Sequence, residues 1–183
     1  VFFLDNFDMH LGVTGKWSQF GVGCRVSDST IRLPYDDTTG VVTPLYPYAV
    51  GSFSQEILFN NCDFLIGYEG TLPVTATGYL IDDLQAFSTA DAATYIRSRK
   101  FVDCRFDSRA ESTANCYRNG HWLFRDCTLA GASSSQAISW VSAPGYVVEL
   151  DLEDINCKNI LGDMLVSSFT ANDHGQYLKL AGK

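Results

Sequence analysis

A six-residue pattern that recurs along the chain constrains the fold more than any other feature. Each copy begins and ends with an apolar residue and, in its clearest form, has Asn or Asp followed by Cys at its centre. The clearest copies are FNNCDF at 59–64, FVDCRF at 101–106 and FRDCTL at 124–129, and weaker ones lie at 4–9, 26–31, 81–86 and 152–157. The residue after the Asn or Asp position, called the slot residue here, falls at 7, 29, 62, 84, 104, 127 and 155, in steps of 20 to 33 residues.

Steps of this size match one coil of a solenoid, in which each turn of the chain adds one strand to each of several parallel sheets. We therefore predict an all-β fold, a right-handed parallel β-helix of about seven coils. Residues 1–183 are expected to form a single β-helix domain. Because the chain opens on a strand-like run at Val1, we also expect it to be a piece of a longer protein.

The pattern also predicts which side chains face inward. Side chains alternate along a strand, so the slot residue and the residue two places on should share the inner side. Asn and Asp tolerate left-handed backbone, which suits a corner immediately before the slot. The predicted corner residues are Asn6, Asp28, Asn61, Asp83, Asp103, Asp126 and Asp154.

The longest step contains a segment that is too rich in proline and polar residues to be regular strand throughout. We predict a protruding loop near residues 34–56. Three tyrosines in it, Tyr35, Tyr46 and Tyr48, are candidate substrate-binding residues, because aromatic rings suit the C–H faces of sugars. The alternative is that they pack the loop onto the body of the protein.

The charge of the chain excludes some partners. A net charge of -8 does not favour nucleic acid, which needs clustered cations. No run approaches the roughly 18 to 20 apolar residues that span a bilayer, so we expect no membrane insertion. One basic segment contains Arg97 and Arg105, which are further candidates for substrate binding. The alternative is a solvated face that balances Asp103 and Asp107.

Cysteine and histidine usage points away from disulfides and from a metal site. Of the six cysteines, Cys62, Cys104 and Cys127 are slot residues, so we predict free, buried thiols there. The three histidines are scattered and no CxxC pair exists, so no zinc site is predicted. Cys116 and His121 are five residues apart, but the segment around His121 is more simply a turn that enters a strand.

Carboxylates at four consecutive repeats suggest a possible site. Seven residues past the slot stand Asp36, Glu69, Asp91 and Glu111. If the turns are equally long, neighbouring carboxylates lie about 5 Å apart, and protons or a calcium ion must neutralise the column. Because paired carboxylates cleave glycosides and esters, Glu69, Asp91 and Glu111 are the candidate catalytic residues. The alternative is that insertions break the register and the acids are unrelated.

Residues 59–72, FNNCDFLIGYEGTL, resemble the pectin methylesterase segment in which an Asn-Cys turn is followed by Gly-Tyr-Gln-Asp-Thr-Leu. The resemblance extends over about 59–106 and places Asp91 at a catalytic aspartate of that family. Glu69 stands at a glutamine position and Gly70 at the other aspartate, and no Leu-Gly-Arg-Pro-Trp motif follows. The resemblance therefore implies a secreted carbohydrate esterase with a degenerate site.

The cysteine-lined interior and the uneven repeats more broadly resemble viral tailspikes and related β-helices that bind or degrade polysaccharide. That resemblance implies a homotrimer on the virion surface or outside the cell, with polysaccharide as its partner. The expected function is thus polysaccharide recognition, with cleavage by a hydrolase, lyase or esterase left open and no cofactor required. The alternatives are a structural spacer in a fibre or virion and the pectin-methylesterase-like enzyme.

Overall fold

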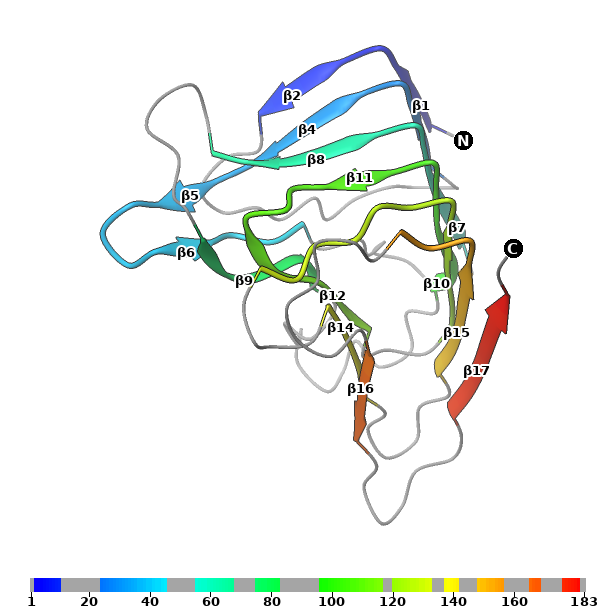
Figure 1. Ribbon diagram of the computed structural model, residues 1–183. Helices are drawn as coiled ribbons and strands as arrows, with labels where there is room; N and C mark the ends of the chain where they lie inside the picture. The colour runs from blue at the N-terminus through cyan, green and yellow to red at the C-terminus, as the bar shows by residue number, and fades with distance from the viewer. Residues whose placement is uncertain are drawn as a thin grey trace, which may run out of the picture.

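The structure is a computed structural model, and its description covers ten stretches of the chain. These are residues 2–10, 24–45, 55–67, 75–82, 96–116, 120–132, 137–141, 148–156, 165–168 and 176–181. All regular elements in them are β-strands, which form three sheets (Figure 1). None of the described segments is a helix long and apolar enough to cross a membrane.

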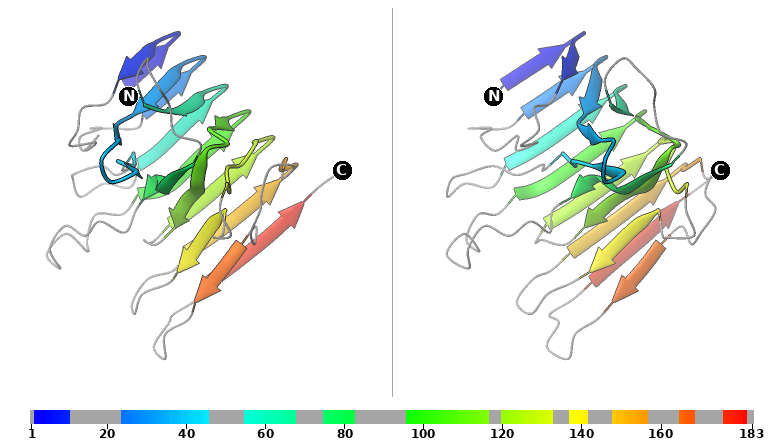
Figure 2. Two further views of the ribbon diagram at one scale, coloured as in Figure 1. Left: turned by 60° about the vertical axis from the view of Figure 1, so that its left-hand side comes forward. Right: turned by 90° about the vertical axis from the view of Figure 1, so that its left-hand side faces the viewer.

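The largest sheet has seven strands, and all neighbouring strands in it run parallel. Its order is β1 (Phe2–Asp5), β3 (Cys24–Ser27), β7 (Gln55–Asn60), β10 (Ile96–Val102), β13 (Gly120–Arg125), β15 (Val148–Glu153) and β17 (Gln176–Ala181). The order in space is therefore the order along the chain, and Figure 2 shows these strands side by side from the blue β1 to the red β17.

Two smaller sheets complete the fold. The four-stranded sheet has the order β11 (Arg105–Phe106), β8 (Asp63–Ile66), β4 (Thr30–Leu33) and β2 (Asp8–His10). The six-stranded sheet has the order β16 (Leu165–Ser168), β14 (Ile138–Val141), β12 (Ala110–Cys116), β9 (Ala76–Asp82), β6 (Val41–Val42) and β5 (Tyr35–Asp36). Side chains from all three sheets contribute to one hydrophobic core.

The predicted fold class, a right-handed parallel β-helix of about seven coils, is wrong, because the structure is not a single solenoid. The described strands form three mostly parallel sheets of unequal size, and β5 pairs antiparallel with β6. The copy of the pattern at 81–86 is not equivalent to the others. Its first residues, Ile81 and Asp82, belong to β9 in the six-stranded sheet and pair with β12. A short local pattern cannot distinguish a corner from a strand that happens to contain aspartate.

The protruding loop predicted near 34–56 is also corrected in part. Tyr35–Asp36 and Val41–Val42 form a hairpin, and Val41 pairs with Thr77 at the edge of the six-stranded sheet. Leu45 forms a further bridge with Ile81, and residue 55 already begins β7. Residues 46–54 lie outside the described ranges.

The corner prediction is confirmed at the six described positions. Their φ angles lie between 49° and 56°, in the left-handed region, at Asn6, Asp28, Asn61, Asp103, Asp126 and Asp154. Each of their backbone N–H groups donates to the carbonyl of the last residue of the next strand in the seven-stranded sheet, for example Asp103 to Arg125 at 3.0 Å and Asp126 to Glu153 at 2.9 Å. Asp83 lies outside the described residues.

The slot residues explain why cysteine recurs in the pattern. The thiols of Cys62, Cys104 and Cys127 are free and buried, as predicted. Each donates to the carbonyl oxygen two residues earlier, at 3.2 to 3.3 Å, and the hydroxyl of Ser29 does the same at 2.6 Å. At these four positions the slot thus holds a small side chain that carries one proton donor.

The core is built on rows of aromatic rings that run across neighbouring strands. Phe59, Phe101 and Phe124 lie in one row, with ring centroids 5.3 and 5.0 Å apart and nearly parallel planes. Phe64 and Phe106 continue the core from the four-stranded sheet at 4.9 Å. Phe7 was predicted to lie on the inner side with the other slot residues, but its ring is not buried in this core, since it is 51% exposed. It precedes β2, the last strand of the four-stranded sheet, where no further strand is described above it.

Candidate functional site

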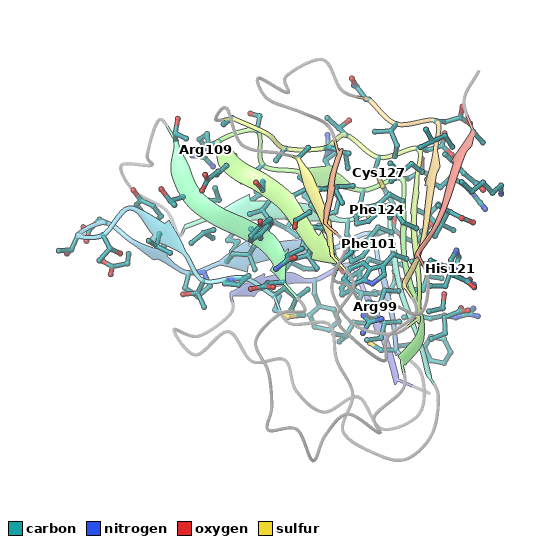
Figure 3. The ribbon with its side chains drawn as sticks, turned by 90° about the horizontal axis from the view of Figure 1, so that it is seen from below. Arg99, Phe101, Arg109, His121, Phe124 and Cys127 are labelled. Atoms are coloured by element: carbon teal, nitrogen blue, oxygen red, sulfur yellow. The ribbon has the colours of Figure 1, made fainter. Side chains whose placement is uncertain are left out.

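The outer face of the seven-stranded sheet carries the polar side chains that form the candidate site. Along β10, Phe101 lies in the core, so its neighbours Lys100 and Val102 project to the other side of the strand. Figure 3 shows His121 of β13 on this outer side and Phe101, Phe124 and Arg99 on the inner side. Arg99 is buried there, with its guanidinium 4.7 Å from the ring centre of Trp122.

Three strands of this sheet bring Ser98, His121 and Asp151 together on the outer face. Ser98 of β10 is the register partner of His121, and Asp151 belongs to the next strand, β15. The Ser98 Oγ lies 3.4 Å from His121 Nδ1, and His121 Nε2 lies 3.1 Å from Asp151 Oδ2. With its proton on Nε2, the imidazole donates to Asp151 and can accept the hydroxyl proton of Ser98 at Nδ1. We call this arrangement the Ser–His–Asp chain.

Charged pairs surround this chain on both sides. Lys179 Nζ lies 3.9 Å from Asp151 Oδ2 and 2.9 Å from Glu153 Oε1, and Arg125 Nε lies 2.7 Å from Glu153 Oε2. The hydrogen bonds from Lys179 and Arg125 lower the pKa of Glu153. On the other side, Lys100 Nζ lies 2.6 Å from Glu56 Oε2. The face therefore presents alternating hydrogen-bond donors and acceptors.

A bulge lies beside Ser98. Ile96 of β10 pairs with Gln55 and Ser98 pairs with Glu56, so Arg97 has no counterpart in β7. This is the one register shift between described strands of the seven-stranded sheet. Bulges re-aim the side chains next to them and are frequent beside active sites.

The predicted carboxylate column is only partly described. Glu111 lies on β12, at a register shift opposite β9, and its Oε2 accepts a hydrogen bond from the backbone N–H of Gly78 at 2.8 Å. Asp36 lies on β5 and accepts hydrogen bonds from Thr38 and Thr39 in a turn. In the six-stranded sheet, β9 and β6 separate these two acids. Glu69 and Asp91 lie outside the described residues.

The structure places the predicted substrate-binding residues apart from one another. Tyr35 is half-buried and packs against the hydrophobic core. Arg105 is exposed on the four-stranded sheet, where its Nε and Nη2 both lie 2.6 Å from the carboxylate of Asp63. Arg97 is in β10 of the seven-stranded sheet, and the position of its side chain is not described. Tyr46 and Tyr48 lie outside the described residues.

Neither a metal centre nor a cysteine nucleophile emerges from the described residues. Within the described ranges, no three His, Cys, Asp or Glu side chains gather in a way that could hold a metal ion. The calcium ion suggested for the carboxylate column stays untested, because Glu69 and Asp91 are not described. Cys116 is buried in β12, whereas His121 lies on the outer face of another sheet. Burial raises the pKa of the Cys24 thiol to about 11, so that cysteine is a poor nucleophile at neutral pH.

Sequence reasoning missed Ser98 and Asp151 and treated His121 as a turn residue. Ser98 and His121 are 23 positions apart, and nothing in their local sequence indicates that they face each other. The available signal was the step from Cys104 to Cys127, which is also 23 residues. Residues that are separated by the same number of positions as two successive slot residues lie side by side, once the two strands are known to pair.

Comparisons of the chain with models of protein families, with curated proteins and with solved structures find no match. The candidate site therefore stands on its geometry alone.

Proposed function

We propose that the chain recognises polysaccharide through the outer face of its seven-stranded sheet. The observation that carries the proposal is a row of hydrogen-bonding side chains that crosses this face at regular intervals. Glu56, Ser98, His121 and Glu149 are register partners on β7, β10, β13 and β15. Neighbouring strands are about 4.8 Å apart, so the row suits a ligand that is itself a repeating polymer.

The chemistry of the face supports a ligand rich in hydroxyl groups. A sugar hydroxyl both donates and accepts, and the carboxylates and cations of this face supply both kinds of partner. Ion pairs exposed on a surface contribute little to stability, typically below about 1 kcal/mol. A ligand can therefore exchange such a pair for its own hydrogen bonds at small cost.

An exposed aromatic ring lies on the same face. Phe3 of β1 is the register partner of Arg25 and is 65% exposed. Four strand spacings separate β1 from β13 in the order of the sheet, which corresponds to about 19 Å at about 4.8 Å per strand. Phe3 thus offers a stacking surface to the far end of a bound oligosaccharide, and a single sugar would not reach both Phe3 and His121.

The proposal is tested with a glycan array, followed by calorimetric titration of the strongest ligand. We expect Phe3→Ala to raise the Kd about 2- to 10-fold, which corresponds to about 0.5–1.5 kcal/mol for one aromatic contact. The matched control is Phe7→Ala, which removes an exposed Phe ring next to the four-stranded sheet. Loss of binding in the Phe7 variant with unchanged binding in the Phe3 variant would contradict the proposal.

A second function, the structural spacer, is favoured by the ends of the sheets. Phe7 is exposed at one end of the stack and Leu180, which is 62% exposed in β17, at the other. Exposed apolar side chains at open strand edges favour association with further strands. A blank glycan array from a protein that elutes as a stable trimer favours the spacer over recognition. A location outside the cell or on the virion surface is part of both proposals.

A further inference from the structure

We infer that the Ser–His–Asp chain is a nucleophilic site that hydrolyses an ester, such as an O-acyl group on the polysaccharide. The inference rests on the proposed function for its substrate class, and its chemistry rests on the three side chains alone. Ser98 and His121 are the catalytic residues, and Asp151 is a positioning residue that acts through the imidazole.

The geometry assigns a separate role to each group. A nucleophilic hydroxyl needs a base within hydrogen-bond reach and a third group that orients the base. His121 Nδ1 lies 3.4 Å from Ser98 Oγ, a separation that is often looser before a substrate binds than in the complex. Asp151 holds the opposite ring nitrogen at 3.1 Å, which fixes the tautomer that leaves Nδ1 free to accept a proton.

Burial keeps the three groups in place, and His121 and Asp151 are the more exposed members. Ser98 is only 8% exposed, while the side chains of His121 and Asp151 are 26% and 23% exposed. Neighbouring side chains cover most of each group and restrict its rotamers. A bound polymer on this face would cover what remains and exclude water, which strengthens the interactions between the charges.

The bulge supplies the irregular backbone that the reaction needs. In a regular parallel sheet the N–H groups are used in the ladder, so they cannot stabilise a developing oxyanion. Arg97 has no register partner in β7 and directly precedes Ser98. We assign the oxyanion to the backbone at this irregular position beside the nucleophile, with the N–H of Arg97 as the proposed donor.

An ester fits this site better than a glycosidic bond. Glycoside cleavage uses a pair of carboxylates on either side of the bond, whereas a hydroxyl next to an imidazole performs acyl transfer. Ser98 Oγ forms a bond to the acyl carbon as its proton passes to His121 Nδ1. That proton then goes to the departing sugar oxygen as the ester C–O bond breaks. Water repeats the sequence on the acyl–serine, which releases the carboxylic acid and returns the proton to Ser98.

A fluorophosphonate probe and p-nitrophenyl acetate test the inference on the whole chain. We expect the probe to modify Ser98 with loss of fluoride, as located by mass spectrometry of peptides. Ser98→Ala should lose labelling and slow ester hydrolysis by at least about 100-fold. The matched control is Ser27→Ala, which removes a serine from β3 of the same sheet. Wild-type protein that stays unlabelled, or equal turnover in the Ser98 variant, would overturn the inference.

The variant Asp151→Asn distinguishes a role of Asp151 in positioning His121 from a purely structural role. If Asp151 orients His121, kcat for p-nitrophenyl acetate falls while KM and the unfolding midpoint stay close to wild type. A fall in the unfolding midpoint with unchanged kcat shows that the residue is structural and contradicts its assignment. Glycan binding and probe labelling, both measured on the unmodified chain, distinguish the two proposals. A chain that binds glycan but is not labelled refutes the ester chemistry alone, and a labelled chain that binds no glycan refutes the proposed function alone.

Discussion

At the scale of single residues, Asp107 holds the turn that joins the four-stranded sheet to the six-stranded sheet. It is buried and accepts hydrogen bonds from the backbone N–H of Ile66 at 2.9 Å and of Arg109 at 3.1 Å. The guanidinium of Arg109 adds a bond from Nε at 2.8 Å and another from Nη2. Burial by itself raises the pKa of Asp107, but these hydrogen bonds outweigh it and the pKa is lowered from its ordinary value.

We expect Asp107→Asn to lower the free energy of unfolding by about 1–3 kcal/mol at pH 7. Because the pKa of Asp107 is lower in the folded chain than in the unfolded one, its contribution is complete above about pH 4 and is lost as the pH falls through the folded value. Urea unfolding at pH 7 and at pH 3 measures the difference in free energy of unfolding between the wild-type chain and the variant. This difference should be smaller at pH 3 than at pH 7. The control is Asp37→Asn, at an exposed turn position. An equal deficit at both pH values would contradict the account.

The residue scale is where sequence reasoning succeeded best. The left-handed corners at Asn61 and Asp103 and the buried thiols at Cys62 and Cys104 depend on the local chain, so a six-residue pattern is enough to predict them. The prediction for Phe7 failed because the burial of its ring depends on whether another strand lies above it. The hydrogen bond from the slot side chain to the carbonyl two residues back was not anticipated, although Ser29 in the same slot pointed to it.

At the scale of elements, each strand of the seven-stranded sheet that precedes a described corner ends because one residue turns left-handed. The φ of 52° at Asp103 is open to Asp, Asn and Gly and costs other residues roughly 1–2 kcal/mol. The corner N–H is bonded to Arg125 at 3.0 Å and the following thiol to Val102 at 3.3 Å. A strained corner would disturb both bonds.

We expect Asp103→Val to destabilise the fold by about 1–2 kcal/mol or more, since a β-branched side chain is poorly tolerated at positive φ. Asp103→Gly removes the carboxylate at the same place and should stay close to wild type, because glycine adopts this conformation without strain. Thermal unfolding of the two variants compares backbone strain with loss of charge. If glycine destabilises as much as valine, the carboxylate and not the backbone defines the corner.

Element pairing is where sequence reasoning failed. Between the corners at Asn61 and Asp103 the chain contributes β8 to the four-stranded sheet, then β9 to the six-stranded sheet, and then β10 to the seven-stranded sheet. Of the segment Ile-Asp-Asp-Leu at 81–84, which satisfies the local pattern, the described residues Ile81 and Asp82 lie in β9 of the six-stranded sheet and not in the seven-stranded sheet. Which strands pair is decided by contacts between distant segments, such as β7 with β10. No six-residue window contains that information.

The Ser–His–Asp chain was missed for the same reason. Ser98, His121 and Asp151 meet only because β10, β13 and β15 pair in one register. A shift of one residue would place His121 in the core and Trp122 outside. Sequence reasoning could find these residue types but not the register that brings them together.

At the scale of the whole molecule, stacking strands in chain order produces one long face with a regular spacing. The seven-stranded sheet presents Arg25, Leu58, Lys100, Leu123, Asp151 and Lys179 as successive register partners on its outer side. The four-stranded sheet presents a second outer face, where Arg105 pairs with Asp63 and Arg32 with Asp8. We propose that ligand binds to the first face and not to the second.

Chemical-shift mapping by NMR tests that assignment most directly, on a chain of 20.2 kDa. The ligand is the oligosaccharide that gives the strongest signal on the array. Amide signals of Leu58, Lys100 and His121, on β7, β10 and β13, should shift on titration, while those of Arg32, Asp63 and Arg105, on β4, β8 and β11, stay in place. Shifts confined to the four-stranded sheet, or none at a saturating concentration, would contradict the central claim.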